Sequence, residues 1–273
     1  QWTHNPFVVG SSPTGATIYA IISIIMKTIS IIIIVKNGEE HIEKALKSAM
    51  WADDIIILDS GSIDNTISIA KKYTNNIHIS EAWPGFGVQR QNAQKLSKSD
   101  WIFMLDADEE ISSSLQKSIR EVIMGEPKIY QVNRLSRAFG TEVKHGWYPN
   151  WISRLYPNNL TTYNDALVHE ALLVPENYKP VKIRGTLHHE TYISMKDYYQ
   201  KMSMYIDAWS TQNIDKKSGG LFKGLVRGFW AFFKMYILKL GFLDGQVGFT
   251  LAFLRYEQTV MKYVDLKIKK KII

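Results

Sequence analysis

Apolar runs alternate with segments of helical spacing along the first half of the chain. Four short apolar runs lie at 28–35, 54–58, 77–80 and 101–105. Runs of this kind are typical of strands that a parallel sheet buries on both faces. Helices are expected at 39–50, 64–73, 89–98 and 112–124. Because strands that alternate with helices build βαβ units, the pattern predicts an α/β fold with a mostly parallel sheet.

The second half of the chain has a different pattern. An aromatic-rich region of strand-like runs extends over 129–191, and a strongly apolar helical region extends over 221–264. The glycine-containing segment 241–248 divides the helical region in two. In its first helix Lys223, Arg227 and Lys234 fall within an arc of about 40° at 100° per residue. The helix therefore carries one narrow basic stripe on an apolar surface.

The beginning of the chain allows two interpretations. Residues 16–35 are almost wholly apolar, and about 20 such residues can span a bilayer. Lys27 near the middle opposes insertion, and the basic segment of a signal peptide is missing before the run. We therefore expect a buried strand at 28–35, with Met26 as the natural start and residues 1–25 as a leader or upstream segment outside the core.

Composition limits the class of protein. Of the 273 residues, 45% are hydrophobic and 22% are charged, which is typical of a globular chain and excludes a disordered one. The sequence has no cysteine, so disulfides and cysteine-based nucleophiles or metal sites are excluded.

The positive charge is concentrated at one end. The net charge is +7, and residues 215–273 hold 12 Lys and Arg against 4 Asp and Glu. The preceding 214 residues hold 21 basic and 22 acidic side chains, because 33 − 12 is 21 and 26 − 4 is 22. A basic extension on a neutral body indicates an anionic partner for the extension alone.

Three interpretations of this extension stay open. An apolar helix with a basic stripe is typical of a helix that lies on anionic lipid, which makes 221–271 a membrane-associating surface. The segment 247–264 could also span the membrane, or the two helices could form a buried pair with a solvated charged edge. Nucleic acid is not expected as a partner, because binding it needs an exposed polar recognition face and the sequence shows none.

Candidate chemistry follows three of the predicted strands. Polar loops begin at Asn37, Asp59 and Asp106, directly after the first, second and fourth apolar runs. Ligands of an open parallel sheet bind at the carboxyl ends of its strands, so these loops are expected at one edge. Each loop taken alone is equally compatible with a turn or a helix cap.

The Asp-Ala-Asp sequence at 106–108 is the sharpest of the three signals. Two carboxylates one residue apart repel each other unless a cation lies between them. Oxygen ligands select Mg²⁺ or Mn²⁺, and Mg²⁺ commonly shares its coordination shell with substrate phosphates. The pattern therefore predicts a divalent metal and a nucleotide diphosphate.

The chain from residue 28 to about 264 resembles the family 2 inverting glycosyltransferases, which have the GT-A fold. More narrowly, it is similar to the β-1,4-glucosyltransferases of the lipopolysaccharide core. The runs that carry the resemblance are ISIIIIVKNGEEHIEKAL, WADDIIILDSGSIDNTISIAKKY, WPGFGVQRQNA, WIFMLDADEEIS, HGWYPNWISRLYP, ALVHEALLV and LKLGFLDG. The resemblance implies a Rossmann-like, mostly parallel sheet flanked by helices, followed by an amphipathic helical extension.

The resemblance also implies roles at the donor site. Asp59 would contact the nucleoside, Asn37 and Glu39 would bind the donor, and Asp106 would hold the ribose or another part of the donor. Many members have two consecutive acids where this chain has Asp59 and Ser60, and its first loop also departs from the family pattern. Asp108 would bind the metal, and a histidine of the pair at 188–189, for which we select His188, would complete the metal site.

Roles in catalysis are implied in the same way. Inversion requires one general base on the face opposite the leaving diphosphate, and the resemblance assigns that base to Glu170. Arg90 and Arg154, with Arg134 as a further candidate, would neutralise the leaving UDP. Trp147 and its aromatic neighbours in the 147–151 segment would pack on a sugar face or on the core.

The sequence thus predicts a leader (1–25), a GT-A catalytic domain (26–214) and a helical membrane-associating extension (215–273). The expected enzyme transfers a hexose, with glucose from UDP-glucose as the expected donor, to a lipid-linked saccharide such as the inner core of lipopolysaccharide. Its expected location is the cytoplasmic face of the bacterial inner membrane, as a peripheral protein. The alternatives are a nucleotidyltransferase, which releases pyrophosphate, and a membrane-docking scaffold without activity.

Overall fold

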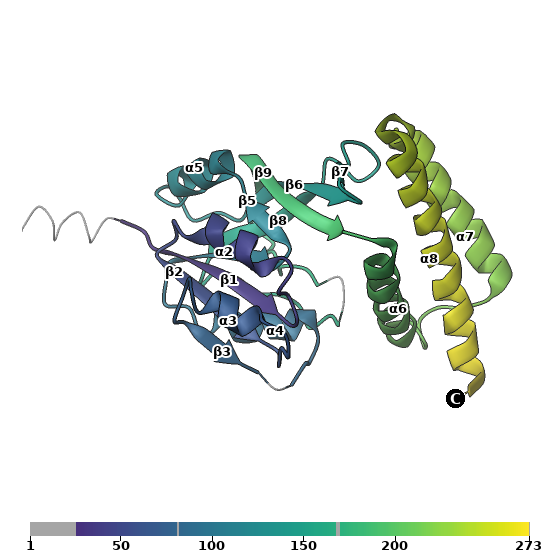
Figure 1. Ribbon diagram of the computed structural model, residues 1–273, viewed down its shortest axis with the longest axis horizontal. Coiled ribbons are helices and arrows are strands. Elements are labelled where there is room, and N and C mark those ends of the chain that lie inside the picture. The colour runs from purple at the N-terminus through teal and green to yellow at the C-terminus, as the bar shows by residue number, and fades with distance from the viewer. Residues whose placement is uncertain (1–25, 81, 168–169, 273) are drawn as a thin grey trace, which may run out of the picture.

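The computed structural model describes residues 26–80, 82–167 and 170–272, so the expected leader at 1–25 lies outside the described part. A single nine-stranded sheet forms the body (Figure 1). The strands are β1 (Ile29–Val35), β2 (Asp54–Asp59), β3 (Ile77–Ile79), β4 (Trp101–Asp106), β5 (Glu109–Ile111), β6 (Tyr130–Ala138), β7 (Thr141–Glu142), β8 (Trp151–Pro157) and β9 (Val181–Tyr192). Their order is β3-β2-β1-β4-β8-β6-β9-β5, and β7 pairs with β6.

The first four strands confirm the predicted parallel part. β1 pairs in parallel with β2 on one side and with β4 on the other, and β3 extends the sheet beside β2. All seven residues of β1 are buried, as expected for the central strand of such a sheet. In this register Val35 lies opposite Asp59 and Ile34 opposite Asp106, so the loops after these three strands meet at one edge.

The second part of the sheet is mixed. β8 runs antiparallel to β4, β6 antiparallel to β8, and β9 parallel to β6. The short strand β5 follows β4 in the chain but pairs antiparallel with β9, which places Glu109 opposite His189. The region 129–191, in which the sequence pattern indicates only strand-like runs, thus completes the sheet and connects it to the acidic loop.

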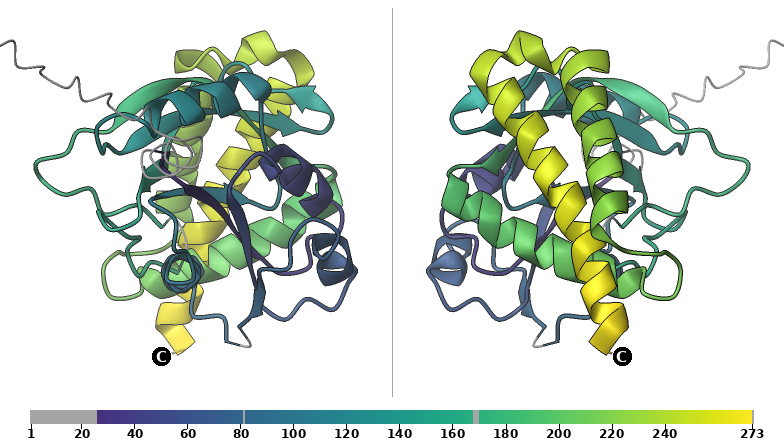
Figure 2. Two further views of the ribbon diagram at one scale, coloured as in Figure 1. Left: turned by 90° about the vertical axis from the view of Figure 1, so that its left-hand side faces the viewer. Right: turned by 90° about the vertical axis from the view of Figure 1, so that its right-hand side faces the viewer.

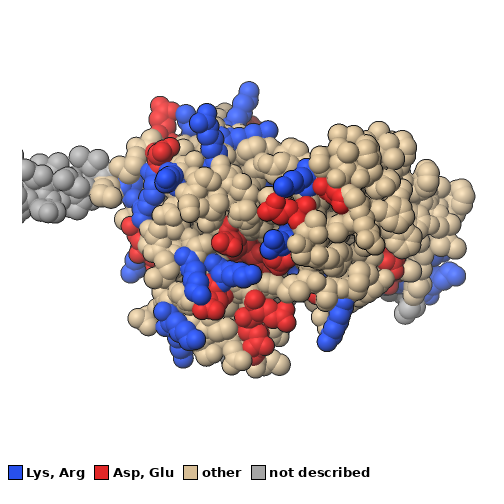
Figure 3. All heavy atoms as spheres, turned by 45° about the horizontal axis from the view of Figure 1, so that its top comes forward, with Lys and Arg blue, Asp and Glu red and all other residues tan. Residues whose placement is uncertain are grey.

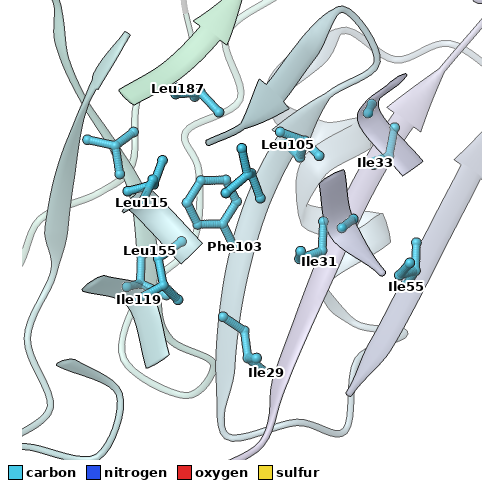
Figure 4. Packing of buried hydrophobic residues seen from close by; sticks show 14 of the residues in the cluster. Ile29, Ile31, Ile33, Ile55, Phe103, Leu105, Leu115, Ile119, Leu155 and Leu187 are labelled. Atoms are coloured by element: carbon cyan, nitrogen blue, oxygen red, sulfur yellow. The ribbon is translucent and has the colours of Figure 1, made fainter. Parts of the chain in front are cut away.

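Helices cover both faces of the parallel part. The four helices are α2 (Ile42–Ala49), α3 (Thr66–Ala70), α4 (Phe86–Gln94) and α5 (Ser113–Val122). Three of the predicted helices are confirmed in shorter form, whereas the one predicted at 89–98 begins three residues earlier, at Phe86, and ends at Gln94. Alternate residues of β1 serve the two faces. Ile31 and Ile33 pack in the core with α2 and α5 (Figure 4), whereas Ile32 and Ile34 pack in a second core with Ala93 of α4.

A helical lobe, which we define as residues 195–272, lies beside this sheet (Figures 1 and 2). It comprises α6 (Met195–Gln212), α7 (Leu221–Phe233), a π-helical turn (Lys234–Leu238), a 3₁₀ turn (Gly241–Asp244) and α8 (Gly245–Ile272). Gly224 and Gly228 allow α7 to pack closely on α8, since a Cβ at either position would lie about 3.0 Å from a backbone oxygen of α8. The predicted break near 241–248 is confirmed.

The outer surface of α7 is apolar and exposed. Phe222 is 80% exposed, Phe229 66% and Trp230 57%. Among the described residues, no single helix has both the length and the apolar composition needed to cross a bilayer. The segments Leu221–Leu238 and Gly241–Lys271, bent by 74°, meet that requirement only as a pair.

Lys262 is buried inside the helical lobe and offers a test of its packing. The residue is 8% exposed, its Nζ lies 5.9 Å from the ring centre of Trp209 on α6, and no carboxylate of a described residue lies within 4.0 Å of it. Burial, assisted by the charges of Arg255 and Lys217, lowers the pKa of Lys262 from 10.5 to about 8. Protonated Lys262 therefore destabilises the folded chain.

We expect Lys262→Met to raise the free energy of unfolding at pH 7 by on the order of 2 kcal/mol. The cost that the variant removes is complete below the folded pKa and disappears as the pH rises above the unfolded value of 10.5, so the gain should shrink between pH 8 and 10.5. Urea unfolding at several pH values measures it. Lys270→Met, at an exposed position of the same helix, is the control, and a destabilised Lys262→Met protein would contradict the expectation.

Candidate active site

The loops after β1 and β2 hold each other in place. The backbone NH of Asn37 donates to Ser62 Oγ over 2.8 Å, and Asn37 Oδ1 accepts from the backbone NH of Ile63 over 2.9 Å. Glu39 Oε2 accepts from the backbone NH of Asn65 over 2.9 Å. Asn37 has a φ of 53°, a left-handed conformation that asparagine tolerates better than most residues. These contacts fix the rim of the sheet edge.

Asp59 lies under the same rim and is 1% exposed. Its Oδ2 accepts from the backbone NH groups of Gly61 and Ser62 over 2.9 and 2.8 Å, and its Oδ1 accepts from the Ser62 hydroxyl over 2.5 Å. The structure therefore brings Asn37, Glu39 and Asp59 together, as the sequence predicted, but their side chains bind the two loops. Their contact with the donor, and that of Asp59 with its nucleoside, stays a prediction.

A network of buried charges stands at the end of β4. Arg90 on α4 donates to Asp106 Oδ1 over 2.6 Å, and Arg154 on β8 donates to Asp106 Oδ2. Arg154 also donates to Glu109 Oε1 over 2.9 Å, and Arg134 on β6 lies 3.3 Å from the same oxygen. Glu109 Oε2 accepts from the backbone NH of Asp106 over 3.0 Å, which closes the turn between β4 and β5.

The network keeps Asp106 and Arg90 ionised despite their burial. Burial alone would raise the pKa of Asp106, but the charges of Arg154 and Arg90 outweigh it and hold that pKa far below its usual value. Burial would likewise lower the pKa of Arg90, and the charge of Asp106 reverses the effect. Because an unpaired buried charge costs several kcal/mol, roughly 3–5 in measured cases, each group depends on the others.

Arg90 extends this network to Glu170. Its Nε donates to Glu170 Oε1 over 2.8 Å, while its Nη2 serves Asp106. The Glu170 side chain is 14% exposed, and its Oε2 accepts no hydrogen bond from a described residue. One guanidinium thus holds the predicted base and the first aspartate of the Asp-Ala-Asp sequence side by side.

Asp108 lies apart from this network. Its Oδ2 lies 3.6 Å from His189 Nε2 and 3.9 Å from the ammonium group of Lys201 on α6. Burial alone would raise the pKa of Asp108, but the charge of His189 and its hydrogen bond outweigh it, so the pKa lies below 3.8. Burial and the nearby Asp108 charge raise the pKa of Tyr205, also on α6, to about 12. The helical lobe therefore reaches the catalytic edge.

The predicted metal site can be tested against these side chains. Asp106 is a poor ligand, because both of its oxygens already accept from arginines. Asp108 and His189 offer an oxygen and a nitrogen that Mn²⁺ or Mg²⁺ can use. Within residues 26–80, 82–167 and 170–272, no group of three or more His, Asp or Glu side chains could hold a metal alone. The pair fits a metal that takes its remaining ligands from substrate phosphates.

The histidine beside Asp108 is His189, whereas the sequence analysis selected His188. Consecutive strand residues point to opposite faces, and the pairing of β5 with β9 sets Glu109 opposite His189 and Glu110 opposite His188. Both histidines line a cavity of about 270 Å³ together with Asp108. Figure 3 shows the acidic side chains of this region gathered in a hollow of the body.

Three residues of the site were missed by the sequence analysis. Glu109 is the middle residue of three consecutive acids, Asp108 to Glu110, and could have been found as the partner of a buried arginine. Lys201 and Tyr205 lie on a helix of mixed polarity, and nothing local in their sequence indicates a site. The aromatic residues near 147 make different kinds of contact. Trp147 packs edge-on against Tyr192 at 6.1 Å between ring centres, whereas the Tyr148 hydroxyl accepts a hydrogen bond from Asn133.

A sheet whose parallel strands end in paired carboxylates, with a further carboxylate held beside them, defines an α/β enzyme that binds its ligand at that edge. The chain belongs to glycosyl transferase family 2, whose sequence model matches residues 30–208. It is a glycosyltransferase with the GT-A fold that the resemblance implied.

Two curated relatives and one solved structure show how far the similarity extends. An uncharacterized glycosyltransferase of Rickettsia prowazekii is 26% identical over 262 residues, which is 89% of each chain. The lipopolysaccharide core biosynthesis glycosyltransferase LpsC of Rhizobium meliloti is 25% identical over 246 residues, 83% of this chain and 89% of LpsC. The structure of S. aureus TarS 1–349 in complex with UDP covers 90% of this chain and 91% of that one, at 13% identity and a TM-score of 0.45.

The dependence of the network on Arg90 can be measured. Arg90→Met should lower the free energy of unfolding by about 3–5 kcal/mol, because it leaves Asp106 and Glu170 without a buried partner. Arg120→Met is the control: its ion pair with Asp53 spans 3.1 Å, but the side chains are 34% and 39% exposed, and such a pair contributes about 1 kcal/mol or less. Equal losses in urea unfolding would mean that the network does not support the fold.

Proposed function

We propose that this family 2 enzyme is a metal-dependent inverting hexosyltransferase that transfers glucose from UDP-glucose to a lipid-linked saccharide. The observation that carries the proposal is the pairing of Glu170 and Asp106 on one buried guanidinium, together with the separate pair of Asp108 and His189. The relation to LpsC favours a lipopolysaccharide or lipooligosaccharide core as the acceptor. The proposed location is the cytoplasmic face of a bacterial inner membrane.

Glu170 acts as the general base in this proposal. Arg90 orients one carboxylate oxygen and leaves the other for the acceptor hydroxyl. Deprotonation of that hydroxyl lets its oxygen attack the anomeric carbon from the face opposite the diphosphate, which inverts the configuration. His169, which precedes Glu170 in the sequence, lies outside the described residues.

Asp108 and His189 would hold Mn²⁺ or Mg²⁺. The metal would supply positive charge to the diphosphate when bound. The protein contributes cations of its own, since Lys201 lies 3.9 Å from Asp108 and Arg134 borders the same region. These groups stabilise the negative charge that develops on the leaving UDP.

The helical lobe would bind the enzyme to anionic lipid. The exposed side chains of Phe222, Phe229 and Trp230 supply apolar area, and the +8 net charge of residues 215–273 supplies attraction to acidic headgroups. In Figure 3 the part of the surface on the side of α7 and α8 shows few charged atoms. A peripheral position of this kind brings the sheet edge to an acceptor that stays in the membrane.

The two carboxylate roles predict different losses. With UDP-glucose at 100 times its Kd and Mn²⁺ present, the wild-type chain should gain about 2.7 kcal/mol of stability. Asp108→Asn should lose the Mn²⁺-dependent part of this gain. Glu170→Gln should keep the gain but transfer the sugar about 10²–10⁴ times more slowly. Thermal shift and UDP release measure the two effects.

Glu176→Gln, at an exposed position six residues after Glu170, is the matched control and should behave as the wild-type chain does. Full transfer by both Asp108→Asn and Glu170→Gln would refute the proposed site. Release of pyrophosphate instead of UDP would identify a nucleotidyltransferase, and a chain that floats with vesicles but shows no metal-dependent nucleotide binding would be a scaffold.

Membrane binding is tested by flotation with vesicles that contain phosphatidylglycerol. The wild-type chain should float at low salt and less so at high salt, because salt screens the attraction. Replacing Phe222, Phe229 and Trp230 with serine should lower the vesicle partition coefficient by roughly 10³-fold or more, since each residue loses about 1.5–3 kcal/mol of burial and every 1.4 kcal/mol corresponds to tenfold. The control replaces three exposed apolar residues of the sheet body, Ile63, Ile79 and Met124. Equal partition to neutral vesicles and to vesicles with phosphatidylglycerol would contradict the proposed preference for anionic lipid.

A further inference from the structure

A cavity of about 540 Å³ lies between the sheet and the helical lobe. We call it the interlobe cavity. Its walls come from β6, β9, the 146–150 segment, α6, α7, the π-helical turn and α8. The proposed catalysis does not use this space. His189 lines both the interlobe cavity and the acidic cavity that contains Asp108, so the two spaces meet at the proposed metal site.

The lining of the interlobe cavity is positively charged. Arg134, Lys234, Lys239 and Arg255 contribute four cations, and none of the described residues that line it is Asp or Glu. Arg134 is partly compensated by Glu109 at 3.3 Å. For the other three, no carboxylate of a described residue lies within 4.0 Å. A concave surface with one sign of charge attracts the opposite sign.

The same cavity has surfaces suited to a sugar. Trp147 and Tyr192 lie against each other at 6.1 Å in its wall, and Asn150 and Gln258 offer amide groups beside them. Aromatic faces with polar groups nearby combine apolar contact with hydrogen bonding. A simple inorganic anion would need only the cations, whereas a sugar with a charged substituent would use both kinds of surface.

The position of the cavity favours the acceptor, and not the nucleotide-sugar donor, as its ligand. His189, which lies beside Asp108, forms part of its wall, and residues of α7 and α8, the helices proposed to face the membrane, form another part. An acceptor held in the membrane by its lipid has to pass this boundary to reach Glu170. The donor diphosphate, by contrast, is expected at Asp108, which lines the acidic cavity and not the interlobe cavity.

We propose that the interlobe cavity binds the acceptor through an anionic substituent, a phosphate or carboxylate on the sugar that receives the hexose or on its neighbour. Lys234 and Arg255 contact the anion, and Trp147 packs against the sugar ring. This inference rests on the proposed transferase function. It deepens that function by naming the acceptor as an anionic saccharide, and it gives the helical lobe a second task besides membrane contact.

Small probes test the cavity without knowledge of the full acceptor. The protein is first saturated with UDP and Mn²⁺ so that the donor site is filled, and glucose 6-phosphate, glucuronate, glucose and sn-glycerol 3-phosphate are then titrated by calorimetry. We expect both anionic sugars to bind about tenfold more tightly than glucose, because charge-assisted hydrogen bonds are the stronger ones. Glycerol phosphate, which represents a lipid headgroup, should bind more weakly than glucose 6-phosphate.

A matched pair of variants locates the effect. Lys234→Gln with Arg255→Gln should weaken glucose 6-phosphate binding about tenfold or more and leave UDP binding unchanged. Lys223→Gln with Arg227→Gln removes the same charge from α7, where both side chains lie over Tyr263 and outside the cavity, and should leave both affinities unchanged. Thermal midpoints equal to that of the wild-type chain would show that all four positions tolerate glutamine.

Several results would overturn the inference. Equal affinity for glucose and glucose 6-phosphate would exclude an anion site. Equal losses of glucose 6-phosphate affinity in both variant pairs would mean that the overall positive charge of the helical lobe, and not the cavity, attracts the anion. Glycerol phosphate binding as tightly as glucose 6-phosphate would assign the cavity to a lipid headgroup. Failure of UDP to bind would instead count against the proposed function, and the sugar titrations would then be interpreted on the nucleotide-free protein.

Discussion

Two arginines with almost no exposed surface hold the acidic edge of this enzyme together. Arg90 and Arg154 share the carboxylate of Asp106, and each reaches a further acid, Glu170 or Glu109. In so dry an environment charges survive only as a complete set. The network therefore ties α4, β4, β8 and the loop that carries Glu170 to a single geometry, and the site is preorganised before any substrate arrives.

The rest of the molecule adds to this edge from two sides. On one side the loops after β1 and β2 fix each other by hydrogen bonds from Asn37 and Glu39, and form a rigid rim. On the other side α6 brings Lys201 close to Asp108. The same helix packs on α8 through Tyr198, whose hydroxyl donates to Leu254 O. Helix α6 therefore connects the proposed metal site to the proposed membrane surface.

The fold could be predicted wherever it depends on the local sequence alone. Isoleucine-rich runs such as 29–35 are compatible with little but a buried strand, and the acids that follow them had to meet at the carboxyl edge. Contacts that depend on distant register were not predictable. A shift of one residue in β9 would exchange His188 for His189 at Asp108, and no pattern in a single sequence fixes that register. Lys201 was hidden for the same reason, since only the packing of α6 brings it to the site.

The pairing of β5 with β9 also has a consequence for synthesis. Glu109 leaves the ribosome 80 residues before its sheet partner His189 and 45 before Arg154. At about 5–20 residues per second, the nascent chain spends roughly 4–16 s with the β5 edge unpaired. During that interval the parallel half can form, but the acidic turn has neither its arginines nor its neighbouring strand. The catalytic edge is thus a late product of folding, and an incomplete chain that has not yet reached β9 is exposed to aggregation at that edge.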